Sequence, residues 1–378
     1  MYKKIPRFLI CNGNPNSYLT HGGLPYNLLK TSKRYGFIDS GINLNYNKLR
    51  SSKYLWNLFQ IFKYRSTGGF QWSDFYSNKL TKQILISSDD EANILSIFPF
   101  LPNYPWPKQW NVDFYIDATT IQIFNSYSIY GNLNKDYKEN ILRREKISYM
   151  NSKNIICRSN WAAKSLINDY EINKNKIHIV PGGANLDFKK IDNKYLFSLP
   201  KRPSKINPVV LGFLGIDWDR KGGSFLTSLA EIFSKNNIPM EIRVVGPKKN
   251  NIRFHPSLKY IGFLDKSKNL DSFVKEVRSW HYGTLFSKAE AYGISNRECL
   301  LLGVPVICHD IGGISSTLPK SNFGKIFNSN PNPEDVYEWI LDSFNPYDKY
   351  IDLRKKLLEK QNEFTWDKAV KNLSEILD

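Results

Sequence analysis

Short apolar, strand-like runs alternate with helix-like segments along nearly the whole chain, and this alternation limits the possible folds more than any other feature. In the first half, Phe8–Cys11, Ile94–Phe98 and Phe114–Ile116 fit buried strands, and a helical pattern begins near Leu24. Strands that alternate with helices are typical of a parallel sheet covered by helices on both faces. The sequence therefore predicts an α/β fold of the doubly wound, Rossmann-like type.

A proline-containing stretch near the middle divides this pattern in two. Residues 198–208 read SLPKRPSKINP, with few apolar side chains, and a new strand pattern starts at Val209. A chain of 378 residues is also too long for one compact α/β unit. We expect two Rossmann-like domains that face each other across a ligand-binding cleft: residues 1–200 and residues 207–362.

The chain is strongly basic. Its formal net charge is +18, and residues 1–200 carry 27 Lys and Arg against 14 Asp and Glu. Such a charge favours nucleic acid, anionic membrane surfaces or phosphorylated small molecules as partners. The sequence contains no RNA-binding motif and the charge is diffuse, so nucleic acid is the least favoured of the three.

Cysteine usage and the lengths of apolar runs predict where the protein works. The four cysteines, Cys11, Cys157, Cys299 and Cys308, have no metal-binding spacing, which fits a reducing cytosol. The apolar run Phe8–Cys11 is too short for a signal peptide, and no run approaches the roughly 20 residues that span a bilayer. We expect a cytoplasmic protein that is not integral to a membrane.

The strongest chemical motif is residues 290–313, EAYGISNRECLLLGVPVICHDIGG. Glu290 and Glu298 bracket seven residues, and Gly293 opens a predicted helix whose first N–H groups suit an anion. Two carboxylates at this spacing can accept hydrogen bonds from sugar or ribose hydroxyls. One alternative needs no ligand: Ser295 and Glu298 form an S-x-x-E capping box.

A second motif, GIDWDRKGG at residues 215–223, lies at a predicted strand-to-helix turn. Arg220 and Lys221 suit a diphosphate, and the glycines after them permit close backbone approach; a solvated basic turn is the alternative. Asp217 and Asp219 have the D-x-D spacing of a metal motif. They precede a phosphate-type turn instead of ending a strand in a lone nucleotide domain, so we do not predict a metal site.

Taken in order, these motifs resemble glycosyltransferase family 4, whose members have the GT-B fold. THGGLPYNLL is similar to the family's Gly-rich N-terminal loop, FYIDATT to its strand-end segment, and SNWAAKSLINDYEINKNKIHIVPGGANLD to the segment before the interdomain crossing. The E-x7-E spacing is typical of retaining members. The resemblance covers nearly the whole chain, and it implies that a C-terminal helix at 365–378 crosses back to the first domain. It implies a retaining hexosyltransferase that moves a sugar from a nucleotide-diphosphate donor to a glycan, lipid-linked or small-molecule acceptor.

The resemblance also implies roles for individual residues. Arg220 and Lys221 would hold the donor diphosphate, Glu290 the transferred sugar and Glu298 the ribose. Asp117 would project toward the anomeric centre as a base or to orient the acceptor, although a strand-end aspartate also serves as a helix cap. The other positions expected around the donor are Gly22 and Gly23 in the first domain, and Gly262, Phe263, Leu264, Gly293, Ile294 and Ser295 in the second.

One position departs from the family pattern. Many members have an Arg directly after the glycine that corresponds to Gly215, and here that residue is Ile216. We expect Arg220 to supply the missing charge. Family members generally work without a metal, so the resemblance implies no metal and no cofactor. The family's breadth and a composition typical of AT-rich bacterial genomes favour a bacterial enzyme of polysaccharide assembly.

Residues 46–72 mix cations with large aromatic side chains. This pattern suits a helix that lies on an anionic membrane surface. It also suits an ordinary packed helix with a solvated basic face, which we favour. In the first case the protein would bind the inner face of the plasma membrane peripherally and its acceptor would be lipid-linked. The residues concerned are Lys48, Arg50, Lys53, Lys63, Arg65, Trp56, Phe59, Phe62 and Trp72.

Three other functions stay open. The same fold serves nucleotide-sugar epimerases and phosphorylases, although we find no pyridoxal-binding lysine in the expected setting. A catalytically weak nucleotide-sugar or glycan-binding protein is conceivable because of Ile216. Nucleic-acid binding comes last.

Overall fold

The structure is a computed structural model, and it describes residues 4–45, 49–87, 91–127, 133–191, 199–252, 255–318 and 323–378. The chain divides into two compact units. Unit 1 comprises Met1–Pro181 and Ala369–Asp378, and unit 2 comprises Gly182–Lys368. The chain therefore passes twice between the units.

The division at residue 181 lies earlier than the linker expected at 198–208. Residues 184–191 contribute to the core of unit 2, where the Ala184 backbone N–H donates to the Phe364 carbonyl at 2.7 Å. The expected linker is itself fixed to unit 2, because His281 donates to the Lys201 carbonyl and Tyr347 to the Pro200 carbonyl. Ser198 lies outside the described residues. Prolines alone therefore did not locate the crossing.

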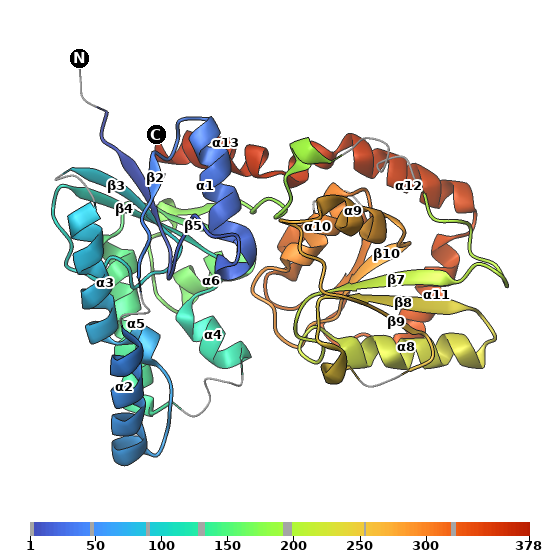
Figure 1. Ribbon diagram of the computed structural model, residues 1–378, viewed down its shortest axis with the longest axis horizontal. Helices are drawn as coiled ribbons and strands as arrows, with labels where there is room; N and C mark the ends of the chain where they lie inside the picture. The colour runs from blue at the N-terminus through green and yellow to red at the C-terminus, as the bar shows by residue number, and fades with distance from the viewer. Residues whose placement is uncertain are drawn as a thin grey trace. The chain divides into compact units, whose positions relative to one another are not determined.

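Unit 1 is built on a parallel six-stranded sheet with the order β2-β1-β3-β4-β5-β6 (Figure 1). Its strands are β1 (Arg7–Ile10), β2 (Ser40–Gly41), β3 (Ala92–Ser96), β4 (Trp110–Ile116), β5 (Ile155–Cys157) and β6 (Ile177–Ile179). Its helices are α1 (Leu24–Arg34), α2 (Arg50–Tyr64), α3 (Asp74–Ser87), α4 (Thr120–Ser126), α5 (Lys135–Asn151) and α6 (Asn160–Asn168), with short 3-10 helices η1 (Thr20–Gly23), η3 (Phe70–Trp72) and η5 (Lys174–Lys176).

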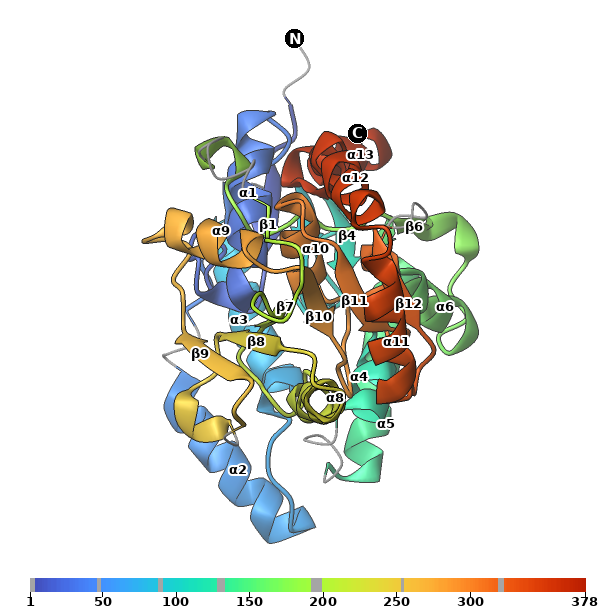
Figure 2. The same ribbon diagram turned by 90° about the vertical axis from the view of Figure 1, so that its right-hand side faces the viewer.

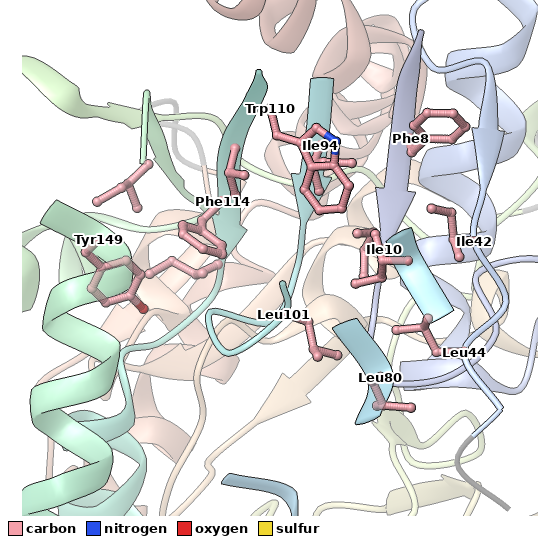
Figure 3. Packing of buried hydrophobic residues seen from close by; sticks show 14 of the residues in the cluster. Phe8, Ile10, Ile42, Leu44, Leu80, Ile94, Leu101, Trp110, Phe114 and Tyr149 are labelled. Carbon is pink, nitrogen blue, oxygen red and sulfur yellow. The ribbon is translucent and has the colours of Figure 1, made fainter. Parts of the chain in front are cut away.

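The main core of unit 1 lies on one face of this sheet. Alternate residues of the strands, such as Phe8 and Ile10, point into it together with Leu80 of α3, and Tyr149 of α5 packs edge-on against Phe114 (Figure 3). Successive residues of a strand face opposite sides of the sheet, so the residues between these point to the other face. Both faces are apolar because a parallel sheet is covered by helices on both sides.

The end of the chain is fixed to the first strand of unit 1. Arg7 of β1 donates to the Leu377 carbonyl and to the Asp378 carboxylate, each at 2.7 Å, and its guanidinium lies 4.5 Å from the centroid of the Phe37 ring. These bonds satisfy the carboxyl end of α13 (Trp366–Leu377), where a cation is favourable. The last ten residues thereby complete unit 1.

Unit 2 contains a second parallel six-stranded sheet with the order β12-β11-β10-β7-β8-β9. Its strands are β7 (Val209–Leu214), β8 (Met240–Val245), β9 (Leu258–Gly262), β10 (Tyr282–Leu285), β11 (Val306–His309) and β12 (Gly324–Phe327). Its helices are α8 (Gly223–Lys235), α9 (Leu270–Arg278), α10 (Ile294–Leu301), α11 (Pro333–Ser343) and α12 (Tyr347–Glu359), with 3-10 helices η6 (Phe188–Lys190), η7 (Lys249–Asn251), η8 (Ile314–Thr317) and η9 (Gln361–Phe364).

Two apolar cores cover the two faces of the unit 2 sheet. Val210 of β7 faces the core formed with α9 and α10, and its neighbours Val209 and Leu211 face the core formed with α8 and α11. Figure 2 shows α8 on the opposite side of the strands from α9 and α10. Strand order reverses where β7 lies between β10 and β8, which makes this the topological switch point of the sheet.

The predicted doubly wound fold is confirmed in both units. The strand predicted to start at Val209 is β7, and the strands predicted at Phe8–Cys11, Ile94–Phe98 and Phe114–Ile116 overlap β1, β3 and β4. Strand β2 and helices α3 and α4 were not predicted from the sequence. All four cysteines are buried and unpaired. Among the described residues, no helix is both long and apolar enough to cross a membrane.

A buried carboxylate holds the start of α4 in unit 1. Glu145 of α5 is fully buried and accepts hydrogen bonds from the Thr120 backbone N–H at 3.0 and 3.1 Å. The hydroxyls of Tyr149 and Tyr170 also donate to it. Burial raises the pKa of Glu145 to about 7, and these donated hydrogen bonds oppose the rise without cancelling it.

Folding therefore makes Glu145 a weaker acid, and the stability that it contributes should fall as the pH rises from about 4.5 to about 7. Between pH 5.5 and 8, we expect the wild-type free energy of unfolding to fall by about 2 kcal/mol relative to Glu145→Gln. Urea titrations at both pH values measure this difference. Glu139→Gln, on the exposed side of α5, is the matched control and should show no such trend. A pH-independent difference for Glu145→Gln would contradict the raised pKa.

Candidate functional site

The turn between β7 and α8 is shaped by glycines that meet other parts of unit 2. Gly222 has a φ of 86°, and a Cβ there would lie 2.1 Å from the Phe286 carbonyl oxygen. A Cβ on Gly223 would lie 2.0 Å from the buried Trp218 ring. The two glycines, predicted to let a diphosphate approach, are thus already required by the protein's own packing.

This turn brings both predicted cations to the first glutamate of the E-x7-E motif. Lys221 Nζ lies 2.9 Å from Glu290 Oε2, and Arg220 Nη1 lies 3.3 Å from the same oxygen. Arg220 Nη1 also donates to the Ala289 carbonyl at 2.7 Å, and its Nε lies 3.3 Å from the Asp217 carboxylate. The side chains of Lys221 and Glu290 are each only 12% exposed. We call Arg220, Lys221 and Glu290 the charged cluster.

The charged cluster keeps its carboxylate ionised. Burial is the largest single effect and raises the pKa of Glu290, but the charges and hydrogen bonds of Lys221 and Arg220 together bring the pKa below its ordinary value. Ser287 Oγ contributes a longer contact of 3.5 Å to Glu290 Oε2. Together with Asp217, the charged cluster has two positive and two negative side chains and thus no net charge.

Two further glycines fix the backbone around Glu290. A Cβ on Gly312 would lie 1.9 Å from the Glu290 carbonyl oxygen, and the Gly313 N–H donates to that oxygen at 3.2 Å. Gly293 is in the left-handed conformation at the N-cap of α10, with no side-chain hydrogen bond to the cap. The first turn of α10, with Ile294 and Ser295, therefore begins four residues after Glu290, at the carboxyl edge of the sheet.

The second glutamate of the motif has a partner that the sequence did not suggest. Glu298 is 2% exposed, and its carboxylate forms an ion pair with Lys266. The Lys266 ammonium also lies 5.2 Å from the centroid of the Phe273 ring. Glu298 thus makes no capping box, and Ser295 is inside the helix and not at its N-cap. Among the described residues, the buried Ser295 Oγ has no hydrogen-bond partner.

The end of β9 lies at the same edge of the sheet as the charged cluster. The Gly246 N–H donates to the Gly262 carbonyl at 3.0 Å, and a Cβ on Gly246 would lie 2.3 Å from the Gly215 carbonyl oxygen. Gly262 has a φ of 90°, so it turns the chain sharply out of the strand. Phe263 after it is largely exposed, and Leu264 packs against the α9–α10 core.

In unit 1, Asp117 follows β4 and pairs with an arginine that follows β5. Asp117 Oδ2 lies 3.4 Å from Arg158 Nη1, with the arginine side chain 4% exposed and the aspartate about half exposed. The alternative role of Asp117 as a helix cap is wrong. Thr119 caps α4 and forms a reciprocal capping box with Gln122. The carboxylate of Asp117 is therefore held by a charge at the sheet edge and remains partly open to solvent.

The Gly-rich loop of unit 1 precedes α1. Gly22 and Gly23 have φ angles of 65° and 86°, and Gly23 is the N-cap of the helix. Asn27 donates to the Gly23 carbonyl at 2.7 Å, and His21 donates through Nε2 to the Asn12 carbonyl at 3.1 Å. The loop follows β1, which is separated from β4 by β3. Both segments follow the carboxyl ends of their strands.

The predicted site residues fall into two sets. Arg220, Lys221 and Glu290 are in direct contact, and the remaining predicted positions of unit 2 flank the carboxyl ends of β9 and β10. Gly22, Gly23 and Asp117 belong to unit 1.

Three residues that contact a predicted site residue or the loop that carries it were not predicted from the sequence: Lys266, Arg158 and His309. His309 donates to the Ser287 carbonyl at 2.7 Å and so fixes the loop that carries Glu290. Arg158 directly follows β5 and His309 ends β11. This strand-end position is the sequence signal that could have identified them as site residues.

No group of three or more His, Cys, Asp and Glu residues in the described parts of the chain is arranged to hold a metal ion. The Asp217 carboxylate accepts from the Arg220 backbone N–H at 3.1 Å and also contacts the arginine side chain. Asp217 therefore organises the basic turn.

Comparisons with known proteins point to one fold. No family model matches the sequence. An uncharacterised glycosyltransferase of Methanocaldococcus jannaschii is 23% identical over 238 residues, which span 62% of this chain and 61% of that protein. Among solved structures, sucrose-phosphate synthase from Thermosynechococcus elongatus has a TM-score of 0.71 at 13% identity, covering 99% of this chain and 98% of its own.

Two further solved structures agree. WaaG, a glycosyltransferase involved in lipopolysaccharide biosynthesis, has a TM-score of 0.65 at 12% identity and covers 98% of this chain and 99% of its own. Anabaena HepE, solved in complex with UDP-glucose, has a TM-score of 0.64 at 13% identity and the same coverage. The chain thus has the GT-B fold, with a parallel six-stranded sheet in each unit, and it is similar in sequence to a glycosyltransferase.

The contact between Lys221 and Glu290 predicts a strong energetic coupling. We expect a double-mutant cycle with Lys221→Met and Glu290→Gln to give a coupling free energy of about 1–3 kcal/mol, because both side chains are nearly buried. Urea unfolding measures the cycle. The matched control is the exposed pair of Asp352 and Lys355 in α12, 3.7 Å apart, whose coupling should be about 0.5 kcal/mol or less. Equal couplings in the two cycles would contradict the geometry of the charged cluster.

Proposed function

We propose that this protein is a retaining glycosyltransferase that moves a hexose from a nucleotide-diphosphate sugar to an acceptor hydroxyl. The observation that supports this most directly is the charged cluster. Two cations and a carboxylate lie next to a helix N-terminus at the switch point of a GT-B sheet. Ligands of doubly wound sheets bind outside the carboxyl ends of the strands at such a point.

The residues of unit 2 match the chemical parts of a nucleotide sugar. Arg220 and Lys221 supply the positive charge that a diphosphate needs, and the N–H groups of Ile294 and Ser295 at the start of α10 favour an anion. Glu290 and Glu298 accept hydrogen bonds from the hydroxyls of sugar and ribose, and Gly262 to Leu264 offer backbone groups for the base. The complex of HepE, a protein of similar fold, with UDP-glucose supports a donor of this class.

In the proposed reaction, the acceptor oxygen attacks the anomeric carbon on the face from which the diphosphate departs. The bond between the anomeric carbon and the phosphate oxygen breaks, and the acceptor proton passes to the leaving phosphate. Arg220 and Lys221 stabilise the charge that develops on the diphosphate. Attack and departure on one face retain the anomeric configuration. Asp117 and the Gly22–Gly23 loop are the proposed contributions of unit 1, and no metal or cofactor is required.

The surroundings of the reaction are also proposals. We place the enzyme in a bacterial cytoplasm, with peripheral contact to the inner face of the plasma membrane and an acceptor that is a glycan or lipid-linked. WaaG, a protein of similar fold, is involved in lipopolysaccharide biosynthesis, which supports an acceptor of this kind. Nucleic acid is not a proposed partner.

One observation favours a second candidate, a catalytically weak protein that binds nucleotide sugars or glycans. Ile216 stands where the family pattern places an arginine, and its side chain is 70% exposed. Arg220 was expected to replace that charge, yet its guanidinium already contacts the Ala289 carbonyl and Asp217. Binding without transfer is the outcome that would favour this candidate.

Calorimetric titration with UDP, GDP and ADP, with and without magnesium, tests the proposed donor site. We expect micromolar binding of one nucleotide, unchanged by magnesium, and a loss of about 100-fold in Lys221→Ala, since a nearly buried charge contact to phosphate is removed. Lys355→Ala, an exposed lysine of α12, is the matched control. If none of the three nucleotides binds, the proposed transferase is wrong. If one binds but no sugar is transferred, the second candidate holds.

The proposed role of Glu298 predicts selectivity for ribose. Lys266 donates to Oε1 of the Glu298 carboxylate, so Oε2 is the oxygen proposed to accept hydrogen bonds from the ribose hydroxyls. The UDP affinity of Glu298→Ala should fall about 10–100-fold and its preference for UDP over 2′-deoxy-UDP should vanish, since one or two charge-assisted hydrogen bonds are lost. Lys266→Ala should keep the preference. Titrations of the two nucleotides measure it, with the exposed Lys268→Ala as the control. A preference that survives in Glu298→Ala excludes this role.

A further inference from the structure

Helix α2 of unit 1 presents a row of large apolar side chains to solvent. Phe62 is 95% exposed and Leu58 is 62% exposed, and the other members of the row are at least about half exposed. Contiguous apolar surface of this kind marks an interaction site in a folded protein. We call this row the apolar face of α2; it consists of Tyr54, Leu55, Leu58, Phe59, Ile61 and Phe62.

The opposite side of α2 is anchored in unit 1, so the apolar face is held outward. Trp56 donates through Nε1 to the Gly68 carbonyl at 2.9 Å, and its ring packs against those of Phe70 and Tyr137. Gln60, one turn further along, is 2% exposed. Within unit 1, both views show α2 farther from the sheet than α3 and α5 (Figures 1 and 2). The favoured sequence interpretation, a packed helix with a solvated basic face, agrees with the packed side and with the exposed cations, but it does not account for the exposed apolar residues.

Cations border the apolar face on both sides. At about 100° per residue, its six side chains cover an arc of about 160°, and Arg50 and Lys63 fall just outside the two ends of that arc. The Lys63 ammonium lies 5.5 Å from the Phe59 ring centroid and 5.1 Å from that of Tyr64. This is the pattern of a helix that lies in a membrane interface, with apolar side chains inserted and cations at the headgroups.

The charge around α2 has one sign. Residues 40–73 contain no Asp or Glu, and they include Lys53 and Arg65 besides the two bordering cations. Lys48, which the sequence analysis assigned to the same group, lies outside the described residues. A helix surface that combines exposed apolar side chains with cations is complementary to a bilayer that carries anionic headgroups, where each nearby cation adds to the attraction.

We propose that the apolar face of α2, with Arg50 and Lys63 at its borders and Arg65 at the carboxyl end of the helix, docks unit 1 onto the surface of an anionic lipid bilayer. The cations meet the headgroups and the six apolar side chains enter the boundary of the acyl region. The docking requires nothing of the reaction proposed above. It would bring a lipid-linked acceptor to the enzyme.

Co-sedimentation of the full chain with vesicles tests this docking. We expect the wild-type protein to pellet with vesicles that contain about 30% phosphatidylglycerol and to stay in solution with pure phosphatidylcholine, with binding weakened by about 0.5 M salt. The double variant Leu58→Ser, Phe62→Ser should lose at least about tenfold in partitioning to anionic vesicles. Both side chains are exposed, so the variant should unfold at the wild-type temperature.

The matched control is Ile206→Ser, an 89% exposed apolar residue of unit 2, which should bind vesicles as the wild type does. Equal partitioning of the wild type and the double variant, or wild-type binding to neither vesicle, overturns the proposal. So does a wild-type dimer that the double variant converts to monomer without any vesicle binding, because the face would then join two copies of the chain. Nucleotide titration of the double variant separates the two proposals: docking can fail while donor binding is intact.

Discussion

The ion pair between Lys221 and Glu290 is the contact on which the candidate site depends. It joins the turn after β7 to the loop after β10, two segments far apart in sequence that follow neighbouring strands. Glu290 can stay ionised although it is nearly buried, because Lys221 and Arg220 outweigh the effect of burial on its pKa. A buried charge without such a partner would cost several kcal/mol. Either loop alone would therefore leave a charged group unsatisfied, and together with Asp217 they form a compact cluster without net charge.

The glycines of both motifs have a structural explanation that is independent of any ligand. Gly222 and Gly312 lie so close to the carbonyl oxygens of Phe286 and Glu290 that no side chain fits, and their positive φ angles add to the requirement. These close approaches bring the two loops within reach of each other. The glycines that suggested a phosphate site are thus the ones that the packing of the loops requires, and in the proposed function a donor would bind to a backbone that is already in place.

The motifs contained the three residues of unit 2 that the structure brings into contact, Arg220, Lys221 and Glu290, but they did not indicate all of the partners. The spacing of Glu290 and Glu298 predicted that they lie on either side of a helix start, and α10 begins between them. It could not show that Lys266, from the segment after β9, occupies the Glu298 carboxylate, because that contact depends on how β9 is ordered in the sheet. The same holds for Asp117. The position of Asp117 at a strand end was predicted, whereas its ion pair with Arg158 was not, and Thr119, not Asp117, caps α4.

By itself, the sequence determined the alternation of strands and helices, the two doubly wound sheets and the basic turn, because these follow from local periodicity and from residue types at short spacing. Tertiary structure alone decided where the chain crosses between the units, since the packing of Ala184 and the hydrogen bonds to Pro200 and Lys201 depend on distant partners. It also decided which side of α2 faces solvent. Both sides of that helix carry aromatic residues, and only the contacts of Trp56 with Phe70 and Tyr137 select the side that is buried. Periodicity identifies a helix with apolar surface, but tertiary contacts determine which of its two apolar faces is buried.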